Sequence, residues 1–145
     1  MLGFICSLLA GAAMSVQGVL NTRLGERVGL YEANMVVQGV AFALSLLAAL
    51  FFGTGHPGAL LRCNKVYLLG GVLGIVITIT VMLAMKGLGA TTAVAVILIT
   101  QLLTAALIDA AGWFDTARIP FVWQKYAGLA LMTAGVLLFK WKLPS

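Results

Sequence analysis

Charged and reactive side chains are scarce in this sequence of 145 residues. Only 9% of the residues are charged and 62% are hydrophobic, whereas about a quarter of the residues in a soluble domain are charged. Too few polar side chains are present to cover a surface in water, so a soluble globule is excluded. Two cysteines and three prolines exclude a disulfide scaffold and a proline-rich disordered chain. The composition therefore predicts a protein whose solvent is lipid.

The residues that usually carry catalysis are also missing. The one histidine, His56, is followed by a proline in an expected loop. The sequence contains no Cys/His set with metal-ligand spacing, no glycine-rich phosphate loop and no Ser/His/Asp group. We therefore expect no enzyme activity, no metal and no cofactor. The formal net charge of +5 indicates basic loops at anionic lipid headgroups and not a nucleic-acid partner.

Five apolar runs are predicted to cross the membrane as helices. They cover residues 2–24, 31–52, 66–85, 91–112 and 122–141. About 20 residues at ~1.5 Å each cross the ~30 Å hydrocarbon layer, a length that the first four runs reach. The fifth run reaches it only with tryptophans and lysines at the interface. The expected fold is an all-α integral membrane protein with five transmembrane helices in a single domain, 1–145.

The linkers expected between these spans are short and contain glycine. They run from Asn21 to Gly29, from Gly53 to Pro57 and from Lys86 to Gly89. Glycine and proline stop helices, so we expect the chain to turn in each of these segments.

Basic residues are almost balanced between the two membrane faces that five spans would produce. One face carries four and the other five; they are Arg62, Lys65, Arg118 and Lys125, against Arg23, Arg27, Lys86, Lys140 and Lys142. The Lys/Arg bias of short loops determines how a protein is oriented in the membrane. A difference of one basic residue therefore favours neither orientation strongly. Two interpretations stay open. Either a weak bias yields one orientation, or copies insert both ways and pair antiparallel, with each other or with a homologous oppositely oriented subunit.

Small residues recur every four positions on two of the spans. They are Gly3, Ser7, Gly11 and Ser15 on the first span and Gly70, Gly74 and Thr78 on the third. Such stripes let another helix backbone approach closely. Packing within one chain and a seam between two chains are both compatible with them. Since five thin helices enclose little volume, an assembly of at least two chains is the economical way to enclose a path.

Amides inside the spans mark a candidate substrate pathway, formed by Gln17, Asn21, Gln38 and Gln101. Gln101 lies about 15 Å along its helix, near the bilayer midplane. An amide without a partner costs several kcal/mol in hydrocarbon, so these groups should face one another, a cavity or water. Asn21 is one turn from Gln17, and Asn34 is one turn from Gln38, so each pair shares a helix face. The amides either hold helices together or line a path for a small-molecule substrate.

Two acidic residues are candidates for coupling or for the mouths of such a path. Glu32 lies beside the first linker, and Asp109 lies about 27 Å along the fourth span, near the interface. A carboxylate there costs much less than the ~3 kcal/mol expected at the bilayer centre, so a capping or snorkelling role for Asp109 stays open. No acid or histidine lies at the midplane, so no proton relay through a central acid is expected.

Several short motifs together resemble the YdcZ-like family of the drug/metabolite transporter superfamily. They are Gln17-x-x-x-Asn21, Gly70-Gly71-x-x-Gly74, Gly89-Ala90-Thr91-Thr92, Gln101-Leu102-Leu103, Asp109-x-x-Gly112 and the closing Gly128…Ala134-Gly135-Val136-Leu137-Leu138. Their order and spacing, over essentially the whole chain, carry the resemblance.

The resemblance implies a bacterial inner-membrane protein equivalent to one half of a ten-helix inverted-repeat transporter and working as an antiparallel pair. Small multidrug-resistance exporters of the same superfamily place an essential Glu in the first helix, where this sequence has Gln17, which argues against their cation and proton exchange. We expect a small secondary transporter that moves a small polar metabolite or organic molecule by alternating access, with membrane lipids and a second copy as partners. The alternatives are a passive dual-topology channel and a non-transporting membrane assembly subunit.

Overall fold

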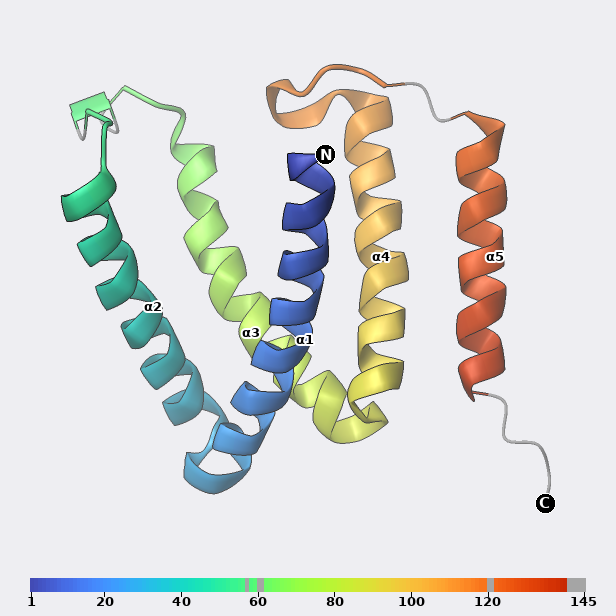
Figure 1. Ribbon diagram of the computed structural model, residues 1–145, viewed down its shortest axis with the longest axis horizontal. Helices are drawn as coiled ribbons and strands as arrows, with labels where there is room; N and C mark the ends of the chain where they lie inside the picture. Colours follow the sequence, from blue (N-terminus) through green and yellow to red (C-terminus); the bar gives the residue numbers. More distant parts are fainter. Residues whose placement is uncertain (57, 60–61, 120–121, 141–145) are drawn as a thin grey trace. The chain divides into compact units, whose positions relative to one another are not determined.

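The computed structural model is helical, without strands, over the residues that it describes, which are 1–56, 58–59, 62–119 and 122–140. Its α-helices are α1 (Leu2–Val28), α2 (Leu30–Phe52), α3 (Leu69–Leu88), α4 (Ala90–Ala111) and α5 (Trp123–Lys140) (Figure 1). Short 3-10 turns, η2 (Lys65–Leu68) and η3 (Trp113–Asp115), lie in the linkers. The predicted all-α class is confirmed for this part of the chain.

Four helical segments are long and apolar enough to cross a membrane, namely α1, α2, η2 with α3, and α4. Few of their apolar side chains are buried within the protomer, which suits helices surrounded by lipid. The fifth helix, α5, has 18 residues, and its role as a span stays a prediction. Trp141 and Lys142, which belong to the predicted span and to the charge count, lie outside the described residues.

The first linker is much shorter than the sequence predicts. Residues from Asn21 to Val28 continue α1, and Gly29 alone separates α1 from α2. Gly29 has φ 104° and ψ 152°, a conformation that only glycine adopts readily. Its N–H donates to the Gly25 carbonyl of α1, while its own carbonyl accepts from the Ala33 N–H of α2. One residue therefore ends one helix and begins the next.

The third linker is shortened in the same way, because α3 continues to Leu88 and the break falls at Gly89, with φ 79°. Gly87 stays within the helix. The second linker agrees better with expectation, since α2 ends at Phe52, directly before Gly53.

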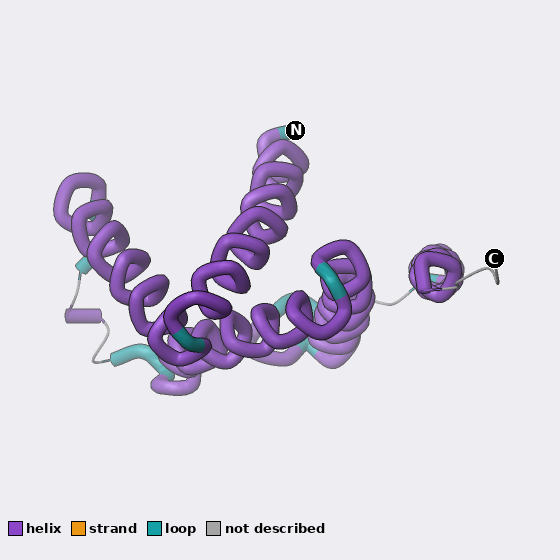
Figure 2. The backbone as a smooth tube through the Cα atoms, turned by 90° about the horizontal axis from the view of Figure 1, so that it is seen from below, coloured by secondary structure: helices purple, strands orange, loops and turns teal. Residues whose placement is uncertain are grey.

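The chain forms two compact units, Met1–Gly87 and Leu88–Ser145. In the first unit, α1 and α2 form an antiparallel hairpin whose helices diverge away from Gly29 (Figures 1 and 2). The helix α3 packs on the part of α1 that precedes this turn, with Met85 against Gly18 and Met82 beside Gly25.

In the second unit, α4 and α5 are antiparallel neighbours (Figure 1). The left-handed Gly112, with φ 66°, ends α4. The following loop then folds back on the helix end: Arg118 Nε donates to the Ala111 carbonyl at 3.2 Å, and the Ile119 N–H donates to the Asp109 carbonyl at 3.0 Å. These bonds satisfy carbonyls that the last turn of a helix leaves unpaired.

We predict that Gly29→Ala lowers the free energy of unfolding by about 1–3 kcal/mol, because the backbone there suits only glycine. The new Cβ would also meet the Glu32 carboxylate, but that flexible side chain can move, so the backbone dominates the penalty. Helicity during detergent titration of the micelle-solubilised protein measures the effect. Gly39→Ala is the matched control, because its Cβ meets nothing within 4 Å and alanine favours the helix. Equal stability of the two variants would contradict the prediction.

Candidate functional site

The buried side chains of the first unit gather where α1, α2 and α3 meet. Gly18 and Asn21 are buried on α1, Ala33 and Asn34 on α2, and Met82 and Met85 on α3. All six belong to the parts of these helices that pack together near the Gly29 turn. Two of the six are polar amides, so this packed region is the candidate site.

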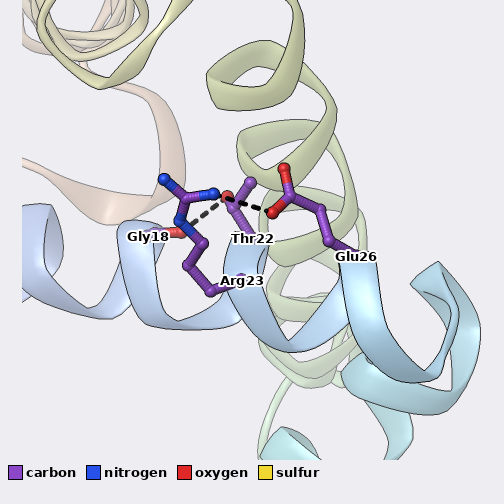
Figure 3. Close-up of polar contacts among 4 residues, drawn as sticks. All are labelled: Gly18, Thr22, Arg23 and Glu26. Carbon is purple, nitrogen blue, oxygen red and sulfur yellow. Dashed lines mark hydrogen bonds and ion pairs between the residues drawn. The ribbon is translucent and has the colours of Figure 1, made fainter.

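A close approach between α1 and α3 occurs at Gly18. A Cβ at this position would collide with the methyl carbon of Met85 and would lie 2.9 Å from its sulfur and 3.2 Å from Val81 Cγ1. Thr22, one turn later, donates its hydroxyl to the Gly18 carbonyl at 2.7 Å (Figure 3). The missing side chain and the internally bonded hydroxyl let α3 lie directly against this face of α1.

Asn21 and Asn34 are the two buried polar residues of the described structure, each with 8% of its surface exposed. The Oδ1 atom of Asn34 is fully buried and accepts no hydrogen bond from the described residues. Leaving a buried acceptor unpaired costs about 1–3 kcal/mol. Asn34 therefore presents an acceptor that a donor from outside the protomer, such as a ligand N–H or O–H or a water, would satisfy.

Gln38 lies one helical turn beyond Asn34 on α2 and connects that helix to α3. Its Nε2 donates to Thr78 Oγ1 at 3.3 Å, and the Thr78 hydroxyl donates to the Gly74 carbonyl at 2.9 Å. A Cβ at Gly74 would lie 3.9 Å from Gln38 Nε2, so the amide rests against the glycine. The structure thus brings together Gln38, Gly74 and Thr78, which the sequence assigned to an amide pathway and to a packing stripe.

A charged rim lies at the end of α1. Arg23 and Glu26 form an ion pair of 3.0 Å on one side of the helix (Figure 3). Both side chains are solvent-exposed, with 75% of the arginine accessible, so the pair adds little stability. With Leu24 and Arg27 these residues line an open hollow of about 450 Å³. The hollow is lined mainly by charged groups, close in sequence to buried Asn21.

The other two predicted pathway amides are exposed. Gln17 lies on α1, and Gln101 lies on α4 in the second unit. Neither side chain has a hydrogen-bond partner among the residues that the structure describes. Both positions fall inside helices long and apolar enough to span the membrane, so any partner for these amides comes from outside the described protomer.

The two acidic candidates occupy helix ends. Glu32 lies in the first turn of α2, where a negative charge interacts favourably with the helix dipole, and it is exposed. Asp109 is half-buried near the end of α4 and lines a groove shared with α5.

The small-residue stripe of α1 faces outward in the first unit. Gly3, Ser7 and Gly11 are exposed and Ser15 is half-buried. The two serine hydroxyls donate to the carbonyls of Gly3 and Gly11, so they leave a flat face without unsatisfied donors. Gly70 on α3 is also exposed. The stripe's predicted role in helix packing is compatible with a contact to another chain.

Sequence reasoning did not select Asn34 or Thr78 as site residues. The spacing between Asn34 and Gln38 places both on one face of α2, which is a signal that would have selected Asn34. Thr78 was assigned only to a stripe of small residues, so its role as a hydrogen-bond acceptor was not predicted. Only the packing of α2 on α3 shows that its hydroxyl is the acceptor for Gln38.

The family comparison covers almost the whole chain. Residues 2–138 match the model of a family described as "Putative inner membrane exporter, YdcZ". Comparisons with curated proteins and with solved structures give no significant match. The long apolar helices and this match agree on a multi-pass inner-membrane location, and the family description indicates a transporter rather than an enzyme. The chain therefore belongs to the family of that description, the YdcZ family.

Proposed function

We propose that the protein is a small secondary transporter that works as an antiparallel dimer and moves a small polar metabolite or organic molecule by alternating access. One observation carries this proposal: amides on membrane helices lack partners within the described protomer. Gln17 and Gln101 are exposed without a bond, and Asn34 Oδ1 is buried without one. Hydrocarbon satisfies none of them, whereas a water-filled path between two copies satisfies the exposed amides of Gln17 and Gln101.

An antiparallel pair follows from the odd number of expected spans and from the balanced charges. Two inverted copies produce the symmetry of inverted-repeat transporters, in which the substrate site lies at the repeat interface near the midplane. Gln17 and Gln101 of each copy then line that interface. Asn21 and Asn34 lie deeper within each protomer, toward the Gly29 end, and a substrate donor reaches the buried Asn34 acceptor when the surrounding helices move apart during alternating access.

The amides define the chemistry of the substrate. They supply donors and acceptors without a fixed charge, so they suit an uncharged or zwitterionic molecule with several N–H, O–H or C=O groups. Glu32 lies in the first turn of α2 and Asp109 near the end of α4, and alternating spans would place them on opposite membrane faces, where either carboxylate binds a coupling proton or cation at a mouth of the path.

Transport into liposomes tests the amide path. We expect reconstituted protein to take up at least one solute from a defined mixture of amino acids, amides and sugars, followed by mass spectrometry. Gln101→Leu and Asn34→Leu should each lower that flux about tenfold or more, because each removes a hydrogen bond to the moving solute. Thr133→Val is the control, since its hydroxyl donates only to the Leu129 carbonyl of its own helix.

Full transport by folded Gln101→Leu would remove the amide path from consideration. Flux that does not saturate and ignores solute on the opposite side would identify the passive channel instead.

Cysteine labelling tests dual topology. In a background of Cys6→Ala and Cys63→Ala, single cysteines are placed at Gly55 and Gly87, where an added Cβ meets nothing within 4 Å. These positions lie on opposite predicted faces. With nearly balanced charges, a membrane-impermeant maleimide should label about half of the molecules at each position in intact spheroplasts. Complete labelling at one position and none at the other would contradict dual topology, provided that no oppositely oriented homologue accompanies the chain.

The non-transporting alternative is favoured at one place, because Gln38 is already paired with Thr78 inside the protomer. A double-mutant cycle of Gln38→Leu and Thr78→Val should give a coupling of about 0.6 kcal/mol in unfolding free energy, the average for membrane hydrogen bonds. Thr80→Val is the control, since its hydroxyl bonds to the Val76 and Ile77 carbonyls of its own helix. If the cycle shows coupling in unfolding free energy and Gln38→Leu transports normally, the pair serves helix packing. If Gln38→Leu loses transport while its unfolding free energy is unchanged, Gln38 belongs to the path.

A further inference from the structure

A groove runs along the contact between α4 and α5. It has a volume of about 270 Å³ and is lined by Leu102, Ala105, Ala106, Asp109, Lys125, Gly128, Leu129 and Met132. All of these residues belong to the unit Leu88–Ser145, and the groove shares only Asp109 with the proposed path, at its mouth. Its lining is apolar except at Asp109 and Lys125.

The two charged residues share one end of the groove. The lining residues on α4 follow the i, i+3, i+4, i+7 pattern of one helix face from Leu102 to Asp109, and those on α5 follow the same pattern from Lys125 to Met132. Figure 1 shows that α4 and α5 are antiparallel neighbours. The order of the lining residues along the two helices therefore puts Asp109 and Lys125 toward one end of the groove and Leu102 and Met132 toward the other. Seven residues separate the ends on each helix, which is about 10 Å.

Small residues keep the groove open between its ends. Ala105 and Ala106 face it from α4, and a Cβ at Gly128 of α5 would meet nothing within 4 Å. The space between the ends is therefore apolar, and its volume of about 270 Å³ accommodates a segment of hydrocarbon chain.

The charged end lies at the membrane surface. Asp109 follows the first residue of α4 by 19 positions, or about 28 Å, which is close to the full thickness of the hydrocarbon layer. The loop beyond it is tied to the helix end by Arg118 and Ile119. The carboxylate and the lysine are thus held at the depth of lipid headgroups, with the apolar groove leading from them toward the bilayer centre.

We propose that this groove binds one phospholipid with a zwitterionic, primary-amine headgroup, of the phosphatidylethanolamine type. The lipid ammonium interacts with Asp109, the phosphate interacts with Lys125, and the upper part of one acyl chain lies along Gly128 and the alanines. The groove matches this lipid in the signs of its two charges and in their place at one end of an apolar space. An anionic headgroup lacks the cation that Asp109 requires, and a quaternary amine has no N–H to donate to it.

Lipid retention tests the site. The full-length protein is purified into micelles containing equal amounts of phosphatidylethanolamine, phosphatidylcholine and phosphatidylglycerol, and bound lipid is measured by native mass spectrometry. We expect phosphatidylethanolamine to be retained about tenfold over the other two, the ratio produced by about 1.4 kcal/mol. Asp109→Asn should abolish this preference.

Filling the groove provides a second variant that leaves both charges in place. Gly128→Leu puts a side chain into the open space and should abolish specific retention of the lipid. Ala130→Leu adds a leucine to α5 outside the groove lining and should retain the lipid. Circular dichroism checks that each variant is helical.

Three results would overturn the proposal. They are equal retention of the three lipids by the unmodified protein, an unchanged preference in Asp109→Asn or Gly128→Leu, and a disulfide between two copies through Met132→Cys with lipid excluded. The last result would show that a second copy of the chain, and not a lipid, occupies the groove. Because the assay measures lipid and not flux, its outcome is independent of the transport test.

Discussion

Hydrocarbon offers no hydrogen-bonding partner, and this constraint governs every part of the protein that enters the membrane. Helices satisfy the backbone internally, and the two shortest helix breaks fall at Gly29 and Gly89, where glycine permits a positive φ. Hydroxyl groups on the helices follow the same rule. Those of Ser7, Ser15, Thr80, Thr100, Thr104 and Thr133 donate to carbonyls of their own helix. Polar side chains can therefore be present without a partner helix.

Amides are harder to satisfy, because each carries donors and an acceptor that one backbone carbonyl cannot match. Gln38 finds its partner on α3, and that bond also connects two helices. Gln17, Gln101 and the carbonyl of Asn34 find none among the described residues. This difference separates polar groups that hold the protomer together from polar groups that require something beyond it, and the membership of an exporter family agrees with such a requirement.

Hydropathy predicted the helices well and their ends less well. The segment from Asn21 to Val28 looked like a loop because it is polar, yet Arg, Leu and Glu are good helix formers and the Arg23–Glu26 pair supports the last turns of α1. The charged residues of this segment indicate where the apolar span ends, but the helix α1 continues through them. The depth of Gln101 follows from the rise per residue, whereas the Gln38–Thr78 bond and the buried Asn34 depend on how α2 packs against α3. A single sequence does not contain that packing.

The length of α1 has a mechanical consequence. Its 27 residues measure about 40 Å, against about 30 Å for the hydrocarbon layer. A helix longer than the hydrocarbon layer accommodates the difference in length by tilting or by extending its polar turns into the headgroup region. Because Gly29 alone joins α1 to α2, the linker is too short for the helices to tilt independently. A change in the tilt of one helix therefore changes the tilt of the other. Bilayer thickness therefore influences the tilt of both helices of the hairpin relative to the membrane normal.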